Sequence, residues 1–167
     1  LGLGIVTGND NIAVGSSAGQ DMTSGADNIL LGNLAGTNLT DNVFNIAIGH
    51  DSLATSANDG DKNIAIGFES MKTGDVSGAE NIGIGSLSLE DLTTGTNNVA
   101  IGSSAGLNLT EAANTIAIGH DAMGAGVVVG NNNIAVGELS GHDLTAGADN
   151  IFVGTKAGGN ATNNTFN

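Results

Sequence analysis

The chain has 167 residues and a formal net charge of −14, with 17 Asp and Glu against three Lys and no Arg. So acidic a chain repels a phosphate backbone, which excludes nucleic acid as a partner and argues against an anionic membrane surface. With 28 Gly, four Phe and no Pro, Cys, Trp or Tyr, it lacks the large side chains of an ordinary core and has no thiol chemistry.

The sequence indicates an excerpt from a longer repeat array. No stretch approaches the roughly 20 apolar residues that span a bilayer, so membrane insertion of this segment is not expected, and no signal peptide is visible. The chain starts without Met and stops at Asn167, the first residue of what would be another repeat. We expect residues 1–10 to be the end of a preceding coil and residues 11–167 to be one array.

The dominant feature is the sequence Asn-Ile-Ala-Ile-Gly, which with close variants returns nine times at steps of 17 or 18 residues. The copies begin at Asn11, Asn28, Asn45, Asn63, Asn81, Asn98, Thr115, Asn133 and Asn150. A short fixed period is typical of solenoids, in which each coil contacts mainly its neighbours. Nine similar units argue against an enzyme, because a catalytic pocket needs one unique constellation.

Each copy begins with a predicted strand. Ile29 and Leu31 point to one side of an extended segment and Leu30 to the other, and the middle residue is Ala in most other copies. We expect the Ile pair to supply the core and the small face to allow close approach. The closing Gly predicts positive φ or a tight corner, and it recurs at Gly15, Gly32, Gly49, Gly67, Gly85, Gly102, Gly119, Gly137 and Gly154.

The rest of each unit predicts a second extended segment joined by Gly, Asn and Asp turns. Three residues after the repeated Gly the residue is always Ala or Ser, which indicates a backbone turning inward. Five units then carry an aliphatic residue followed by Thr, as in Leu39-Thr40, whereas the units at Asn45 and Thr115 lack this pair. A helix is not expected, since each Gly in a helix would cost about 1 kcal/mol.

Few large aliphatic side chains fall in each coil, which favours several chains sharing one core. We expect a homotrimer with the small face of each strand near a common axis, and a monomeric solenoid is the alternative. At a strand spacing of about 4.8 Å, nine coils would form a rod roughly 43 Å long.

The motif Asn-Ile-Ala-Ile-Gly-x-x-Ala-Gly-x-x-Leu-Thr resembles two groups of repeats over residues 11–167. One is the head repeat of trimeric autotransporter adhesins (YadA-like), which stacks as left-handed β-rolls. The other occurs in phage tail-fibre and surface proteins. The resemblance implies an all-β solenoid of left-handed β-roll type, in a homotrimeric fibre at a bacterial surface or on a virion. The adhesin unit is typically shorter, so the Leu-Thr segment is a departure.

Three sets of polar residues invite a site interpretation. The repeated Asn predicts an amide ladder along the rod, each side chain bonding to the next coil. The pairs His50-Asp51, His120-Asp121 and His142-Asp143 are typical of proton relays or metal ligands, but exposed turn residues are the favoured interpretation. Oxygen-rich turns at Asn9-Asp10, residues 58–61 and Ala148-Asp149 leave structural calcium open. No catalytic residue and no other metal or cofactor is expected.

Two further patterns are weaker. The threonines of the Leu-Thr pairs and their counterparts, namely Thr23, Thr40, Thr93, Thr110, Thr145 and Thr162, form an interrupted row of the kind found in ice-binding solenoids. Glycosylation sequons begin at Asn38, Asn108, Asn160 and Asn163, and they matter only in a glycosylating host.

The sequence therefore predicts a non-catalytic segment of an extracellular fibre, from a phage tail fibre or a bacterial adhesin. It would extend the fibre and present variable turns, such as Asp51 to Asp61 and Gly124 to Asn132, to a host-cell receptor of glycan or protein nature. The alternatives are a subunit of a self-assembling extracellular filament or sheath, and an ice- or calcium-binding solenoid.

Overall fold

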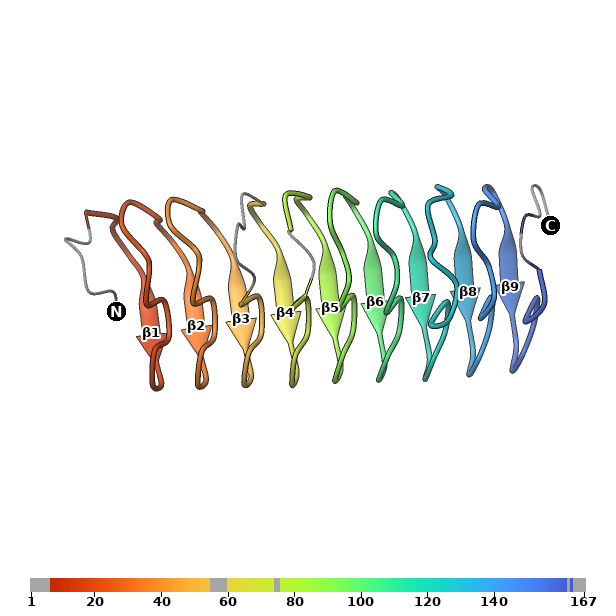
Figure 1. Ribbon diagram of the computed structural model, residues 1–167, viewed down its shortest axis with the longest axis horizontal. Coiled ribbons are helices and arrows are strands. Elements are labelled where there is room, and N and C mark those ends of the chain that lie inside the picture. Colours follow the sequence, from red (N-terminus) through yellow and green to blue (C-terminus); the bar gives the residue numbers. More distant parts are fainter. Residues whose placement is uncertain (1–6, 55–59, 74–75, 162, 164–167) are drawn as a thin grey trace.

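The computed structural model describes residues 7–54, 60–73, 76–161 and 163, and this part of the chain is an all-β solenoid. Its nine strands are β1 (Ile12–Val14), β2 (Ile29–Leu31), β3 (Ile46–Ile48), β4 (Ile64–Ile66), β5 (Ile82–Ile84), β6 (Val99–Ile101), β7 (Ile116–Ile118), β8 (Ile134–Val136) and β9 (Ile151–Val153). They lie side by side in chain order, with β1 and β9 at opposite ends (Figure 1). In the described residues, no helix is long and apolar enough to cross a membrane.

All neighbouring strands are parallel and share one register. Ile29 pairs with Ile46, which pairs with Ile64 in the next coil. Backbone bonds continue past each strand, since Ile29 N–H donates to the Asn45 carbonyl at 2.9 Å and Gly49 N–H donates to the Leu31 carbonyl at 2.8 Å. Both the 17- and the 18-residue steps preserve this register. Each repeat position therefore forms a column along the rod.

The repeated Gly ends each strand for two separate reasons. Its φ lies between 122° and 144° in all nine copies, a region that L-residues avoid, which confirms the predicted positive φ. Neighbouring coils also approach closely there: a Cβ on Gly49 would lie 2.3 Å from the Gly67 carbonyl oxygen. Glycine is thus required by conformation in all nine coils and by contact in every coil but the last.

The two faces of the sheet are the reverse of what the sequence predicts. The middle residue points into the coil, where Leu30 and Ala47 are fully buried, while the flanking aliphatics face outward. Ile12 is 52% exposed and Val153 is 68% exposed. The prediction that the Ile pair supplies the core is therefore wrong, and so is the prediction that the small face lies at an axis between chains. The coil is narrow, and its own return segment already fills its interior.

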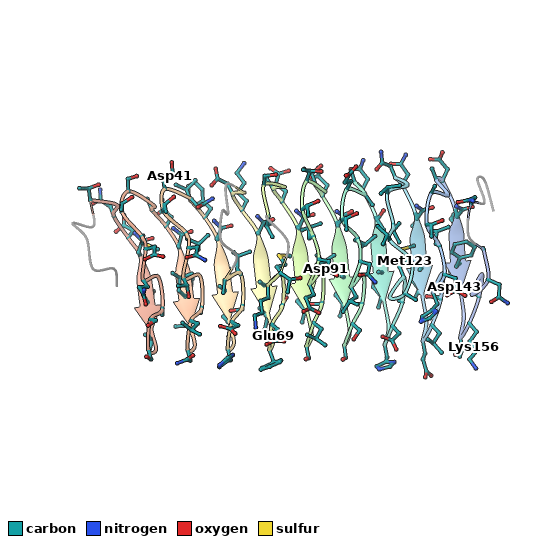
Figure 2. All side chains as sticks on the ribbon, in the orientation of Figure 1. Asp41, Glu69, Asp91, Met123, Asp143 and Lys156 are labelled. Atoms are coloured by element: carbon teal, nitrogen blue, oxygen red, sulfur yellow. The ribbon has the colours of Figure 1, made fainter. Side chains whose placement is uncertain are left out.

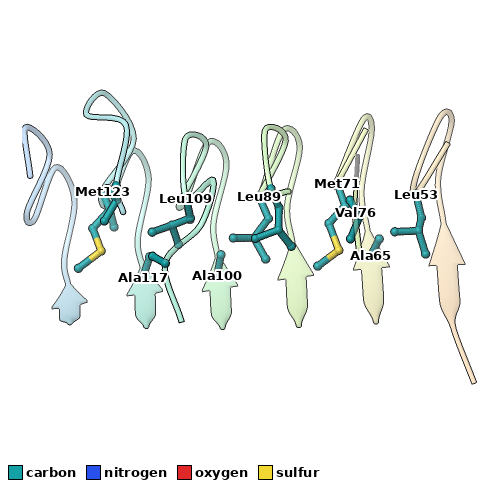
Figure 3. Close-up of a cluster of buried hydrophobic side chains, with 14 of the residues drawn as sticks. Leu53, Ala65, Met71, Val76, Leu89, Ala100, Leu109, Ala117 and Met123 are labelled. Atoms are coloured by element: carbon teal, nitrogen blue, oxygen red, sulfur yellow. The ribbon is translucent and has the colours of Figure 1, made fainter. Parts of the chain in front are cut away.

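The core comes mainly from that return segment. Met22, Leu39, Leu92, Leu109 and Leu144 are fully buried against the inner face of the sheet. The three coils that begin at Asn45, Asn63 and Thr115 lack an aliphatic-Thr pair and bury Leu53, Met71 and Met123 instead, each four residues after the repeated Gly. Figure 3 shows Leu53, Leu109 and Met123 of this segment, one on each of three coils, inside the rod.

Side-chain volume is balanced in the two coils whose inner strand residue is large. Leu30 is the large inner residue of β2, and a Cβ on Gly36 would come within 2.6 Å of its Cδ2 atom. Phe152 of β9 is likewise accommodated by Gly158, where an added Cβ would lie 2.2 Å from the ring. A large residue in one column thus accompanies glycine in the other. The position three residues after the repeated Gly, which is Ala or Ser in every copy, is buried in eight coils.

The second extended segment does not form a strand in the described residues, contrary to expectation. Its backbone still bonds from coil to coil, as Thr23 N–H donates to the Thr40 carbonyl at 2.8 Å and Thr93 N–H to the Thr110 carbonyl at 2.9 Å. Left-handed residues near this segment, such as Gly19 (φ 59°) and Leu89 (φ 51°), bend the chain before a regular ladder can form.

Two glycine substitutions separate the two requirements of the strand end. Gly102 (φ 133°) would place an added Cβ 2.6 Å from the Gly119 carbonyl oxygen, whereas Gly154 (φ 122°) has nothing within 4 Å of that position. We expect Gly102→Ala to lower the free energy of unfolding by about 2–4 kcal/mol and Gly154→Ala by about 1–2 kcal/mol. Equal losses in chemical denaturation would mean that conformation alone requires glycine.

Candidate functional site

The most prominent surface feature is an uninterrupted aliphatic strip, here called the outer face. It consists of the first and third residues of every strand, and all eighteen are Ile, Val or Leu: Ile12, Val14, Ile29, Leu31, Ile46, Ile48, Ile64, Ile66, Ile82, Ile84, Val99, Ile101, Ile116, Ile118, Ile134, Val136, Ile151 and Val153. Every one is at least partly exposed. A soluble monomer rarely exposes so long a continuous apolar surface.

Two exposed columns flank the outer face. The leading column is the residue before the repeated Asn or Thr, and all nine members are solvent-exposed: Asp10, Asp27, Phe44, Lys62, Glu80, Asn97, Asn114, Asn132 and Asp149. The trailing column follows the repeated Gly and comprises Ser16, Asn33, His50, Phe68, Ser86, Ser103, His120, Glu138 and Thr155. The leading column carries four carboxylates and the trailing column only one.

Stacking continues along these columns. The rings of His50 and Phe68, on successive coils of the trailing column, stack with centroids 5.5 Å apart and an interplanar angle of 21°. In the leading column, Lys62 Nζ lies 3.2 Å from Glu80 Oε1. Figure 2 shows side chains projecting from both turn regions of the rod, with Asp41 at one and Glu69 and Lys156 at the other.

The repeated Asn forms the amide ladder that the sequence predicts, and it lies inside the coil. The side-chain oxygen of Asn81 accepts from Asn98 N–H at 3.0 Å, and its Nδ2 donates to the Gly95 carbonyl at 2.9 Å. Both partners belong to the next coil. Asn28 and Asn98 repeat this pattern, and each of them is fully buried. The amide thus satisfies one backbone donor and one acceptor that strand pairing leaves unpaired.

Thr115 is the one departure among the nine copies. Its hydroxyl donates to the Ala113 carbonyl at 3.4 Å, two residues back in the same coil. Thr115 therefore lacks an equivalent of the hydrogen bond that Asn98 Nδ2 donates to the Ala112 carbonyl, at 2.7 Å, in the next coil.

The His-Asp pairs lie in the turns and remain separate. Nδ1 lies 3.5 Å from the carboxylate in His50-Asp51, 3.3 Å in His120-Asp121 and 3.0 Å in His142-Asp143. No three His, Cys, Asp or Glu side chains of the described residues are grouped so that they could hold a metal. A hollow beside the last described coil is lined by Leu139, His142, Asp143, Lys156, Gly159 and Asn160.

Two of the oxygen-rich turns use their carboxylates within the protein. Asp61 accepts from Val43 N–H at 2.9 Å, and Asp149 accepts from Asn132 Nδ2 at 3.0 Å. Residues 58 and 59 of the predicted calcium turn at 58–61 lie outside the described residues. These bonds tie neighbouring coils together and give the carboxylates a structural role.

Threonines and sequon asparagines also bond between coils. Thr23 Oγ1 donates to the Thr40 carbonyl at 3.1 Å and Thr93 Oγ1 to the Thr110 carbonyl at 2.8 Å. Asn108 Nδ2 donates to the Gly124 carbonyl at 2.8 Å, and Asn38 Nδ2 to the Ala54 carbonyl at 3.2 Å. The Thr162 position lies outside the described residues.

One cluster of charged residues contains groups with shifted pKa values. Lys72 Nζ lies 2.8 Å from Asp51 Oδ2 and 2.6 Å from Glu69 Oε1, and its hydrogen bonds to these two carboxylates raise the pKa of its ammonium. Nearby, burial raises the pKa of the Glu90 carboxyl, and the Asp91 and Glu69 charges raise it further.

Sequence reasoning missed the outer face and its flanking columns, although one signal was available. Residues 28 and 30 must share a face, so an Asn that ladders inside the coil places Ile29 outside. Comparison with known proteins adds no relative, since no family model, curated protein or solved structure matches this chain.

The Asn ladder predicts opposite effects for two substitutions. Asn81→Ala leaves a buried N–H and a buried carbonyl unpaired, so we expect a loss of about 2–4 kcal/mol in the free energy of unfolding. Thr115→Asn restores the amide to the column and should add about 1 kcal/mol. Thermal and chemical denaturation would measure both, and a neutral Asn81→Ala would contradict a stabilising ladder.

The raised pKa of Glu90 predicts that replacing this residue with Gln stabilises the protein at neutral pH and not at low pH. When the pKa of a carboxyl is higher in the folded than in the unfolded protein, folding favours its protonated form. The stability that this form contributes is present below the unfolded pKa and is lost as pH rises through the folded pKa. We therefore expect Glu90→Gln to raise Tm at pH 7, with the gain vanishing below about pH 4.3. The exposed carboxylate variant Glu111→Gln is the control. A gain that persists at pH 3 would exclude charge burial as its cause.

Proposed function

We propose that this chain is a structural, non-catalytic segment of an extracellular fibre, in a phage tail fibre or a bacterial surface adhesin. The observation that carries the proposal is that the repeated positions form columns along the rod. The repeated Asn, the repeated Gly and the small position each make or allow a contact between stacked coils. A sequence constrained in this way at every coil is suited to extending a rod. Catalysis imposes no such nine-fold demand.

The proposed fibre contains three copies of the chain. The supporting observation is that the outer face is only two side chains wide in each coil, so three such strips can converge on one axis. Sharing this face would give the thin rod the apolar burial that its own single row of core residues supplies only in part.

Receptor contact is assigned to the variable turns. The turn at residues 124–132 carries Val127 and Val129, which are 56% and 43% exposed, on both sides of the buried Val128. Exposed aliphatic residues on a turn, away from the repeated columns, are where a host-cell glycan or protein surface would be bound. The resemblance to adhesin and tail-fibre repeats points to the same role.

Limited proteolysis and small-angle X-ray scattering, each with and without a chelator, test this proposal. We expect an elongated particle with a mass of three chains, resistant to protease and unchanged by the chelator. Rapid cleavage within the coils, or unfolding when calcium is removed, would contradict a structural fibre segment. Mass that rises with concentration would favour the open filament.

A further inference from the structure

We propose that the hollow beside the last described coil binds an acidic sugar, a hexuronic acid unit of a surface polysaccharide, through its carboxylate. The inference rests on the fibre role above only for the source of that sugar, a host-cell glycan. It adds a binding position outside the variable turns and names the chemical class of its ligand.

The hollow is formed by two consecutive coils. Its six lining residues come from the coils of β8 and β9: Leu139, His142, Asp143, Lys156, Gly159 and Asn160. Figure 2 shows two of them, Asp143 and Lys156, at the β9 end of the rod. The volume of about 280 Å³ lies just below the roughly 300–1,000 Å³ of sites for drug-sized ligands. The hollow therefore suits one sugar ring, with the rest of a polysaccharide in solvent.

The repeat register shows what fills the same place elsewhere in the rod. Gly159 lies five residues after the repeated Gly, the position that Lys72 occupies in the coil of β4. There Lys72 Nζ lies between two carboxylates, 2.8 Å from Asp51 Oδ2 and 2.6 Å from Glu69 Oε1. Glycine at the same position leaves the corresponding space in the coil of β9 without a side chain.

The charges around this space are inverted relative to the Lys72 cluster. The counterparts of Asp51 and Glu69, two residues after the repeated Gly, are Leu139 and Lys156. The backbone preserves the equivalence, since Glu69 N–H and Lys156 N–H each donate to the trailing-column carbonyl of the preceding coil, at 2.9 and 2.8 Å. A cation thus borders the place where the cluster holds an ammonium, and an anionic group is its complement.

Lys156 is the lysine that remains for an external anion. Lys62 is paired with Glu80, and Lys72 with its two carboxylates. No carboxylate of the described residues lies within ion-pair distance of Lys156, and its side chain is exposed. In a chain with a net charge of −14, this ammonium gives the hollow a local attraction for an anion. The Asn160 amide adds a second donor beside it.

The opposite wall suits a ring that carries hydroxyl groups. His142 Nδ1 lies 3.0 Å from Asp143 Oδ1, which leaves His142 Nε2 and Asp143 Oδ2 for ligand hydroxyls. Leu139 is half-buried and offers an apolar contact for the C–H face of the ring. An inorganic phosphate would use only the cationic wall. A hexuronic acid matches all three elements, with its carboxylate, hydroxyls and C–H face.

Binding of methyl glucuronide to the full chain tests the ligand class. Methyl glucoside is the matched probe, because it carries a hydroxymethyl group in place of the carboxylate. In NMR titrations we expect a Kd on the order of 1 mM for the glucuronide, as for a small ligand in a shallow site, and at least tenfold weaker binding of the glucoside. Equal affinities for the two sugars, or equally tight binding of inorganic phosphate, would overturn the proposal.

Two variants test the position. We expect Lys156→Met to weaken glucuronide binding at least tenfold, whereas Lys62→Met, with the same change in net charge, keeps the parent Kd. Gly159→Leu should abolish binding by filling the hollow, and the coil of β6 already carries Leu107 at this position. A parent Kd in Gly159→Leu, or equal losses in the two lysine variants, would contradict the site.

The outcomes for the sugar site and for the fibre role can be told apart. A protease-resistant rod of three chains that binds neither sugar would overturn this inference and leave the structural role standing. A chain that binds the glucuronide but is rapidly cleaved within its coils would support the site and contradict the fibre role.

Discussion

The constraint on which the whole structure depends is the shared register between consecutive coils. Ile29, Ile46 and Ile64 lie opposite one another, and the same holds for every other position of the strands. Once one residue of the repeat is placed, its eight counterparts are placed as well. A residue that makes a favourable contact at one repeat position therefore makes it again in each coil, and an unfavourable contact would recur in the same way. This explains why the sequence tolerates so little variation at the Asn, Gly and small positions.

The narrow coil decides which residues are inside. Three residues of strand leave one inward side chain, and the return segment supplies Leu109 or Met123 to meet it. Little space remains, so the inner residue is usually Ala, and the buried amide of Asn98 occupies the rest by bonding to the next coil. The larger β-branched residues are then directed outward. The apolar outer face is thus a consequence of how the coil closes.

Much of the fold could be predicted from the repeat itself, because nine copies report the same local requirement. The strand at Ile46–Ile48, the positive φ of Gly49 and the small residue at Ser52 each follow from sterics that a single unit already reveals. The assignment of faces could not be made in this way, since alternation fixes two sides without saying which is covered. Which face is covered depends on whether the Asn45 side chain is solvated or bonded to the protein. It lies inside the coil, where its oxygen accepts from the buried Asn63 N–H. The balance between Leu30 and Gly36 was hidden for a related reason: the two residues meet only after the coil has closed.

The same physics links stability to the proposed role. The contacts of the rod repeat from coil to coil, and the continuous apolar surface that its described residues leave exposed is the outer face. The most direct test of this account is the accessibility of aliphatic methyl groups to a soluble paramagnetic reagent in NMR spectra of the chain in solution. The account predicts that Ile48 and Ile66 methyls are shielded while those of Val127 and Val129 are strongly broadened. Equal broadening of both sets would show that the outer face is open to water and would contradict its role as a contact between copies.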